Sequence, residues 1–314
     1  MRRYRSPVDA KAALLAWYDR EARDLPWRRT RDPYAIVVAE FMLQQTTVRR
    51  VTEKWRPFLD RFPTWSALAK AAPGAAIDAW RGLGYNRRAL RLRELALEVM
   101  DRGGTLPQEP DALRRLPGVG TYTVSAIRAF VLGHDVATID VNLRRVLGRW
   151  LFGREGVRDR EVAAAAQAIL PPGQAKEWNQ ALMDIGATIC GVRAPRCLLC
   201  PIHPECRWAA SEKIHRDDRS AGRRQGRFAG SSRQVRGRIV DLLRDHFPEP
   251  LSRAAAIERV KDALVVDSAS VEAALLSLVR DGLVEDRVGP DTDLLVLPAA
   301  RSPERKAQLG FRGR

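Results

Sequence analysis

Residues 116–130, LPGVGTYTVSAIRAF, place a glycine-containing turn between two short stretches with helical periodicity, at 109–116 and 121–130. Gly118 and Gly120 permit a tight turn and a close approach of the backbone to another group. The free N–H groups at the start of the second helix suit a phosphate. The pattern therefore predicts a helix-hairpin-helix clamp for a DNA backbone, with a plain turn between two helices as the alternative.

Charge points to a polyanionic partner. The chain has 314 residues, with 54 Lys and Arg against 38 Asp and Glu, a net charge of +16 and a pI near 10.6. Such an excess favours nucleic acid or an anionic membrane surface, although a merely well-solvated protein would also fit. There is no apolar run of the ~20 residues needed to cross a bilayer and no signal-peptide core near the start. We therefore expect a cytoplasmic protein. If its polyanionic partner is nucleic acid, it would be nucleoid-associated and have no membrane partner.

Hydrophobic periodicity predicts a mainly helical chain, with strand-like alternation scarce before residue 280. Residues 1–208 form the expected core, and 209–232, rich in Arg, Gly and Ser, read as a basic linker. Residues 233–300 predict three helices and a hairpin, as in a winged helix, and 301–314 a disordered tail. The predicted fold class is all-α with a small C-terminal α+β module.

All four cysteines lie in CGVRAPRCLLCPIHPEC, residues 190–206, with the spacing C-x6-C-x2-C-x5-C. Disulfides are disfavoured in the cytosol, where this chain is expected to be. Four thiolates suit an iron–sulfur cluster, but they also suit zinc. Spacing alone leaves cluster and zinc about equally open.

Two carboxylates are candidates for chemistry. Glu40 lies among apolar residues of a predicted helix, where desolvation would raise its pKa. The alternative is a solvated polar stripe that Glu40 shares with Gln44 and Thr47. Asp140, in ATIDVNLRRV, suits the N-cap of the following helix, and this role is compatible with a functional one.

Several motifs taken together resemble those of a known family. They are LPWR at 25–28, AEFMLQQT at 39–46, GLGY at 82–85, LPGVGTYT at 116–123 and NQALMDIGATIC at 179–190. In this order, and with Asp140 and the cysteine spacing, they resemble the MutY-type adenine DNA glycosylases of the helix-hairpin-helix, or endonuclease III, superfamily. The resemblance extends over roughly residues 10–210.

The resemblance implies roles for the candidate residues. Glu40 would be the general acid that protonates the adenine ring, and Asp140 the anion that stabilises an oxocarbenium-like sugar, with Asn142 as a supporting amide. Bifunctional members carry a lysine at the position of Tyr122, which here is either part of the site or a tyrosine that packs the hairpin. The enzyme would therefore be monofunctional. A [4Fe–4S] cluster would be held by the four thiolates, namely those of Cys190, Cys197, Cys200 and Cys206.

The resemblance also implies DNA contacts. Gln44 and Tyr85 resemble wedge residues that enter the base stack when the target nucleotide is flipped out. The remaining expected contacts are Leu25, Trp27 and Arg28 of the adenine pocket, Gln45 and Thr46 beside the wedge, the hairpin glycines Gly118 and Gly120, and Asp184 near the adenine edge. The implied partner is double-stranded DNA with a mismatched or damaged pair, bound by a monomer.

The sequence departs from the family at three places. Asn86 follows Tyr85 where the family usually has a second tyrosine, and Val141 follows Asp140 where glycine is frequent. The C-terminal region is too short and too helical for the Nudix-like domain that reads 8-oxoguanine in many relatives. Because the predicted hairpin is acid-rich, we expect the module to read DNA weakly and the core to hold most discrimination of the opposite base.

The predicted function is excision of adenine mispaired with 8-oxoguanine or guanine in base excision repair. A second enzymatic interpretation is a thymine or uracil mismatch glycosylase, which the segments TTV and NRRA and the residue Tyr122 also resemble. A third, from another class, is a catalytically silent DNA-binding protein whose cluster acts as a sensor.

Overall fold

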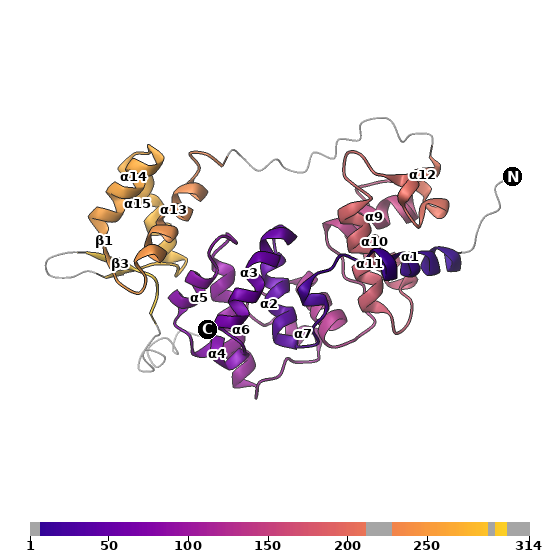
Figure 1. Ribbon diagram of the computed structural model, residues 1–314, viewed down its shortest axis with the longest axis horizontal. Coiled ribbons are helices and arrows are strands. Elements are labelled where there is room, and N and C mark those ends of the chain that lie inside the picture. The colour runs from indigo at the N-terminus through magenta and orange to yellow at the C-terminus, as the bar shows by residue number, and fades with distance from the viewer. Residues whose placement is uncertain (1–6, 212–227, 288–292, 300–314) are drawn as a thin grey trace, which may run out of the picture. The chain divides into compact units, whose positions relative to one another are not determined.

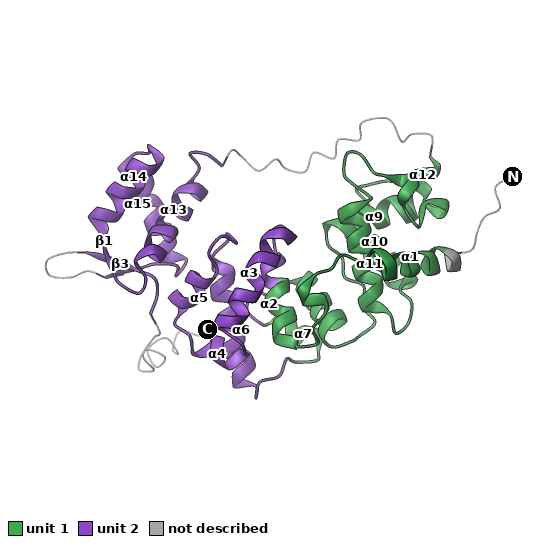
Figure 2. Ribbon diagram, in the orientation of Figure 1, with its two compact units in different colours: residues 1–40, 107–115, 119–224 green, residues 41–106, 116–118, 225–314 purple. Residues whose placement is uncertain are grey.

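The computed structural model describes residues 7–211, 228–287 and 293–299, which are mainly helical and carry one small sheet. The predicted fold class is confirmed. The chain divides into two compact units (Figure 2), which are described separately. The first unit comprises 1–40, 107–115 and 119–224, and the second 41–106, 116–118 and 225–314. Most of the predicted linker and all of the predicted tail lie outside the described residues, and the proposed domain boundaries stay a prediction.

The first unit is a bundle of helices (Figure 1). Its elements are α1 (Pro7–Glu21), η1 (Pro26–Arg28), most of α2 (Pro33–Leu43), α7 (Pro110–Arg114), α8 (Thr121–Ala126), η2 (Ile127–Val131), α9 (Val141–Phe152), α10 (Asp159–Ile169), α11 (Ala175–Thr188), η3 (Cys197–Leu199), η4 (His203–Glu205) and α12 (Arg207–Ala210). Its largest apolar core is formed mainly by α1, α9, α10 and α11. The centre of this core contains Leu14, Leu147, Trp178 and Ile185, each at most 1% exposed.

The second unit begins with the last turn of α2 and continues through four helices. These are α3 (Val48–Arg61), α4 (Trp65–Lys70), α5 (Pro73–Ala79) and α6 (Arg87–Asp101). Helix α6 buries Leu92, Leu95 and Val99, which recur every three or four residues and so lie on one face that packs against α4. This packing fixes the loop that precedes α6.

The same unit contains the C-terminal module, defined here as residues 231–299 where described. Its helices are α13 (Ser232–His246), α14 (Arg253–Leu264) and α15 (Ser268–Arg280). Its strands β1 (Leu251–Ser252), β2 (Glu285–Arg287) and β3 (Leu294–Val296) form an antiparallel sheet in the order β1-β3-β2. The three predicted helices and the hairpin strands are present. Strand β1 was missed because two residues carry no readable alternation.

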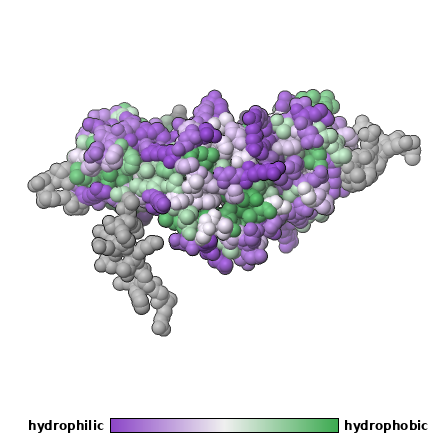
Figure 3. Space-filling view, turned by 60° about the horizontal axis from the view of Figure 1, so that its bottom comes forward, coloured by the Kyte–Doolittle hydropathy of each residue, from purple (hydrophilic) through white to green (hydrophobic). Residues whose placement is uncertain are grey.

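One face of the molecule is mainly hydrophilic (Figure 3). Hydrophilic residues predominate over much of the face drawn in Figure 3, with smaller apolar areas between them. No helix in the described ranges combines the length and the apolar character that crossing a membrane requires.

Candidate active site

Glu40 lies near the end of α2 and is 6% exposed, so it does not form the solvated stripe that was the alternative. Burial in apolar surroundings raises the pKa of its carboxyl to about 7. A hydrogen bond from Tyr122 and the charge of Arg28 act in the opposite direction, whereas the negative charge of Asp140 adds to the increase. Near neutral pH a substantial fraction of Glu40 therefore carries a proton.

Tyr122 faces this carboxyl from the first turn of α8. Its hydroxyl donates a 3.1 Å hydrogen bond to Oε2 of Glu40. The pKa of the phenol is raised well above its usual value, mainly by burial and then by the Glu40 charge, so the hydroxyl remains a donor. The structure thus gives Tyr122 a place beside the candidate acid, although its ring also packs on the small apolar cluster under the hairpin.

Asp140 is the N-cap of α9, as the sequence predicted. Its Oδ1 accepts a 2.7 Å hydrogen bond from the backbone N–H of Leu143. Its Oδ2 accepts from the amide of Asn142 at 3.2 Å, and the Asn142 oxygen in turn accepts from Arg145. These bonds hold the carboxylate in one orientation, and its charge reaches both Glu40 and Tyr122.

Asp184 is the best-buried acid of this group, with no side-chain exposure. Both its oxygens accept from Arg28 at 2.8 Å, and they also accept from Nε and the backbone N–H of Arg23 at 2.6 and 2.9 Å. Burial alone would raise the pKa of Asp184, but these hydrogen bonds hold it below its ordinary value. The carboxylate therefore fixes Arg28, whose charge is felt at Glu40.

The other two expected pocket residues flank Arg28 in the chain. Leu25 is 8% and Trp27 7% exposed, so both are core residues as they stand. Trp27 and Arg28 belong to η1, which begins at Pro26, a favourable residue for a first helical turn. The same short turn thus carries Arg28, whose guanidinium lies 5.7 Å from the centre of the Tyr18 ring.

The wedge candidates belong to the second unit. Tyr85 is 47% exposed, with φ of 45°, and Gln45 has φ of 55°, so both are non-glycine residues in the left-handed region. Thr46 donates to the carbonyl of Leu83 at 3.1 Å, which ties the loop after α2 to the loop before α6. Gln44 and Tyr85 line one shared hollow, together with residues of the C-terminal module described below.

Arg88 joins these two loops, although no sequence motif singled it out. Nη1 of Arg88 donates to the carbonyls of Phe41, Met42 and Gln44, and Nη2 donates to the Leu83 and Gly84 carbonyls and to the Thr46 hydroxyl. Its guanidinium lies 5.6 Å from the centre of the Tyr85 ring. A signal was present, because Arg88 falls on the same helical face as Leu92, Leu95 and Val99. A charged residue on an apolar stripe indicates a buried hydrogen-bonding role.

The hairpin has the expected shape. Gly118 has φ of +74°, and a Cβ added there would lie 2.6 Å from Cε1 of Phe41 and 3.0 Å from Cβ of Arg91. Gly120, the N-cap of α8, has extended backbone with no atom within 4 Å of an added Cβ. Only Gly118 is therefore required by packing. The open space at Gly120 lets another group approach the backbone where α8 begins.

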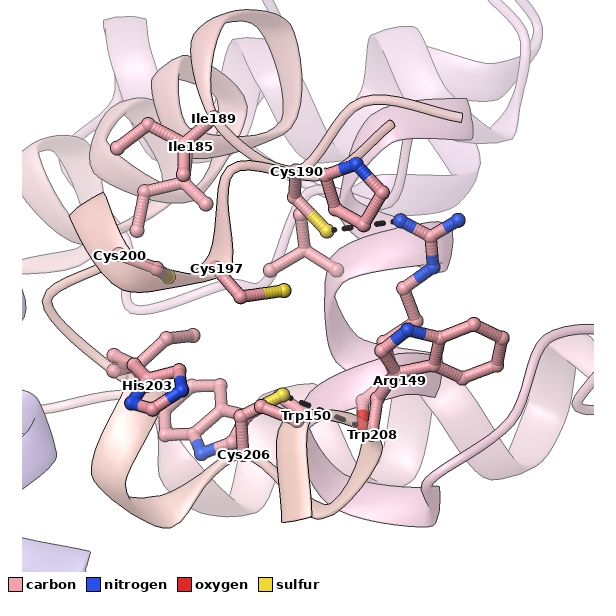
Figure 4. A pocket seen from close by; sticks show the side chains of 14 residues that line it. Arg149, Trp150, Ile185, Ile189, Cys190, Cys197, Cys200, His203, Cys206 and Trp208 are labelled. Carbon is pink, nitrogen blue, oxygen red and sulfur yellow. Dashed lines mark hydrogen bonds between the residues drawn. The ribbon is translucent and has the colours of Figure 1, made fainter. Parts of the chain in front are cut away.

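None of these four cysteines forms a disulfide, and all four line one pocket between α9 and the segment 190–209 (Figure 4). Burial raises the pKa of Cys200 to about 12 and also raises the pKa of Cys197 and Cys206, so their thiolates require positive charge nearby. Within the described ranges, no three His, Cys, Asp or Glu side chains gather closely enough to hold one metal ion. A cluster spreads its four ligands more widely than a single ion does, and the shared pocket is consistent with such a set.

Arg149, a residue that no sequence motif singled out, is a cation in the lining of this pocket. It is 3% exposed and donates to Sγ of Cys190 at 3.4 Å and to the carbonyls of Gly191 and Val192. Its guanidinium lies 4.9 Å from the centre of the Trp208 ring. As with Arg88, the signal was an arginine among the buried apolar positions of an amphipathic helix, here α9.

The candidate residues therefore fall into two groups. One group, gathered in the first unit, comprises Leu25, Trp27, Arg28, Glu40, Tyr122, Asp140, Asn142 and Asp184. Within it, a protonatable acid, a fixed carboxylate and a buried guanidinium act on each other electrostatically. The other group, in the second unit, comprises Gln44, Gln45, Thr46, Tyr85 and Gly118.

Comparison with known proteins gives a consistent result. Residues 38–172 match the HhH-GPD superfamily of base excision DNA repair proteins. The chain is 42% identical over 294 residues to the adenine DNA glycosylase of Mycolicibacterium smegmatis, covering 89% of this chain and 92% of that protein. It is 37% identical over 202 residues to the thymine-DNA glycosylase of Aeropyrum pernix, covering 62% of this chain and 91% of that protein. The solved structure of a thermostable thymine-DNA glycosylase covers 65% of this chain and 96% of its own, with a TM-score of 0.61 and 30% identity.

The helical fold and the family match together place the chain in the HhH-GPD superfamily of base excision DNA repair proteins. Within that superfamily, the chain belongs to the adenine DNA glycosylase family. The resemblance of the sequence motifs is thereby confirmed. Since 89% of the chain is covered by the mycobacterial relative, the match must extend into the C-terminal module.

Proposed function

We propose that this protein is a monofunctional DNA glycosylase that releases adenine mispaired with 8-oxoguanine or guanine. The observation that carries the proposal is the state of Glu40, a buried acid whose pKa is raised to about 7. A general acid is most effective when its pKa lies near the working pH. The names of the relatives over most of the chain support adenine as the base.

The proposed reaction is hydrolysis of the bond between the sugar and the base. Glu40 donates its proton to a ring nitrogen of adenine, and the electron pair of the breaking C–N bond then leaves with the neutral base. The sugar develops oxocarbenium character, which the Asp140 carboxylate stabilises, held in place by Asn142 and the N-cap bond to Leu143. Water adds to the anomeric carbon and loses a proton. Return of that proton to the Glu40 carboxylate restores the enzyme for the next cycle.

The residues around Glu40 would position the flipped-out base. Arg28 is held by two hydrogen bonds to Asp184 and so presents a fixed donor beside Glu40, with Trp27 next to it in the chain. Asp184 acts through Arg28 because its own oxygens already accept four hydrogen bonds. Tyr122 offers a hydroxyl and no amine, so it forms no Schiff base with the sugar.

The four cysteines would hold a [4Fe–4S] cluster. When bound, the cluster would tie the four cysteines of the segment 190–206 to one another. Arg149 of α9, which also pairs with Glu155, would offset part of its negative charge from the Cys190 side. Arg193 and Arg196 add positive charge within this segment, and Arg207 directly follows it. We propose that this segment and the hairpin at Gly118 and Gly120 bind the phosphates of double-stranded DNA.

Single-turnover base release from defined duplexes tests the proposal. The substrates are adenine opposite 8-oxoguanine, guanine or thymine, and thymine or uracil opposite guanine. Adenine release from the first two, faster than any thymine or uracil release, is the expected result. Borohydride should trap little enzyme–DNA adduct, because the reaction has no imine intermediate.

A second function is favoured by one specific observation. Two thymine-DNA glycosylases, one compared by sequence and one by structure, are 37% and 30% identical to this chain. If thymine opposite guanine were released faster than adenine from either of its mispairs, the thymine mismatch assignment would replace the adenine one. Tight duplex binding with no base release at all would instead indicate the silent DNA-binding protein.

A further inference from the structure

The C-terminal module packs on α5 without a gap. The N–H of Gly74, in the first turn of α5, donates a 2.6 Å hydrogen bond to the carbonyl of Pro298. A Cβ at Gly74 would lie 2.8 Å from that oxygen and 2.9 Å from atoms of Leu297 and Phe247. Ile77, from the next turn of α5, is fully buried in the apolar core of the module. The module is therefore an integral part of the second unit.

Arg244 of α13 binds both α5 and the loop before α6. It is 6% exposed, and its Nε and Nη2 donate to the carbonyl of Ile77 at 3.1 and 2.7 Å. Nη2 also donates a 2.9 Å hydrogen bond to Oδ1 of Asn86. Asn86 is the residue at which the sequence departs from the double tyrosine of the family, and a phenol there would offer a hydroxyl in place of this amide oxygen. The asparagine found at position 86 thus has a hydrogen-bond donor, Arg244, in the C-terminal module.

The loop that Asn86 ends is strained and carries the exposed Tyr85. The left-handed region is unfavourable for a tyrosine, so its φ of 45° requires support from its neighbours. Arg88 supplies it from within the core by binding the Leu83 and Gly84 carbonyls. Arg244 adds support from the module by binding the side chain of Asn86, the residue after Tyr85.

The module also lines the hollow beside Tyr85. Arg236 and Asp281 pair there at 2.6 Å, and Asp281 is also 3.5 Å from Arg87 at the start of α6. The hollow is lined by Tyr85, Gln44 and Gln45 on the core side and by Arg236, Asp281 and Leu283 on the module side. The wedge candidates and the module thus share one surface.

We propose that the C-terminal module braces the Tyr85 loop, and that Arg244 and Asn86 are positioning residues for base excision. The inference rests on the proposed function, because it assigns Tyr85 to the wedge that accompanies flipping of the base. It replaces the expectation that the module is a separate, weak reader of DNA. The module acts through the conformation of Tyr85, and it requires no base contact of its own.

Asn86→Ala is the central variant, since it removes the acceptor for Arg244 and nothing else that the described contacts assign to the side chain. Asn86 lies at the N-cap of α6, but its side chain makes no capping hydrogen bond, so helix capping is unchanged. Asn86→Asp keeps the acceptor and should restore function. The matched control is Asp245→Asn, which weakens a different contact between module and core, the 2.7 Å pair of Asp245 with Arg81.

Two measurements on the full-length protein test the brace. In single-turnover adenine release, Asn86→Ala should be about tenfold slower than wild type, because small misplacements of a positioning group cost that much or more, with duplex affinity changed by less than about twofold. In hydrogen exchange of the free protein, the amides of Arg88 and Ala89, bonded to the Tyr85 and Asn86 carbonyls, should exchange faster. Asn86→Asp and Asp245→Asn should match wild type in both measurements.

The two measurements separate failure of the brace from failure of the proposed function. Unchanged exchange at Arg88 and Ala89 in Asn86→Ala overturns the brace, whatever base the enzyme releases. Faster exchange with an unchanged rate of adenine release overturns the link to excision. Equal losses in Asp245→Asn would mean that general docking, and not the Arg244–Asn86 bond, supports the loop. A wild type that releases no adenine contradicts the proposed function, while the exchange data still decide on the brace.

Discussion

The hydroxyl of Tyr122 donates a 3.1 Å hydrogen bond to Oε2 of Glu40, across 82 residues of sequence. The bond favours the charged form of Glu40 and so lowers its pKa, against the larger effect of burial. The net result is a carboxyl with a pKa of about 7, which can both hold and release a proton near neutral pH.

Glu40→Gln should abolish excision while leaving binding intact. The amide is similar in size and still accepts from Tyr122, but it has no proton to give. We expect adenine release to fall by at least ~10², the usual size of a general-acid effect, in single-turnover assays. Met42→Leu, a conservative core change on the same helix, is the control. Release by Glu40→Gln within a few-fold of wild type would remove Glu40 from the mechanism.

Tyr122→Phe should move the pH profile of excision. Loss of the hydrogen bond removes a contribution that lowers the pKa of Glu40, so this pKa should rise above about 7. Since the protonated acid is the active form, the rate should hold to a higher pH before it declines. Single-turnover rates measured across the neutral range report the shift. If the excision rate of Tyr122→Phe declines at the same pH as that of the wild type, or at a lower pH, this role of Tyr122 is contradicted.

Glu40 should also make the folding stability of the protein depend on pH, with lower stability at higher pH. Its pKa is raised from 4.5 to about 7 on folding, so the folded state binds the proton more tightly than the unfolded state. Stability is therefore lost as pH rises from about 4.5 through about 7, by at most roughly 3 kcal/mol. Glu40→Gln should remove this loss, and it should raise the Tm relative to wild type more at pH 8 than at pH 5. An equal difference at both pH values argues against a raised pKa.

Gly118→Ala should weaken binding to every duplex alike. The added methyl group meets the Phe41 ring at 2.6 Å and the backbone has φ of +74°, so the hairpin must deform. We expect about tenfold weaker binding of matched and mismatched duplexes, and a smaller dependence on salt if phosphate contacts are lost. Gly173→Ala is the control, since its φ is +73° and nothing lies within 4 Å of an added Cβ. Loss confined to a single mismatch would contradict a backbone clamp.

Protein purified without air should be brown and contain about four irons per chain. Cys200→Ser should lower both the iron content and the yield of folded protein, because Cys200 packs against the apolar core of the first unit. Iron and zinc analysis of the wild type, alongside Cys200→Ser, checks both statements. One zinc per chain without iron would establish the zinc alternative.

Much of this protein could be predicted from local sequence. The hairpin follows from two glycines between helical stretches, and the N-cap role of Asp140 from its place before an amphipathic run. The three helices and hairpin of the C-terminal module follow from periodicity. Each of these depends on a few adjacent residues, whose backbone preferences act over short distances.

The tertiary structure decided how distant residues act on one another. Sequence placed Glu40 in an apolar helix, but only packing determined that it is buried, and that Tyr122 and Asp140 lie within electrostatic reach. Desolvation and charge depend on distance in space, which no local pattern encodes. The same reason explains Arg88 and Arg244, whose long side chains bind carbonyls and amides far away in the sequence. A sequence shows that an arginine lies on an apolar face, whereas its partners are known only once the helices have packed.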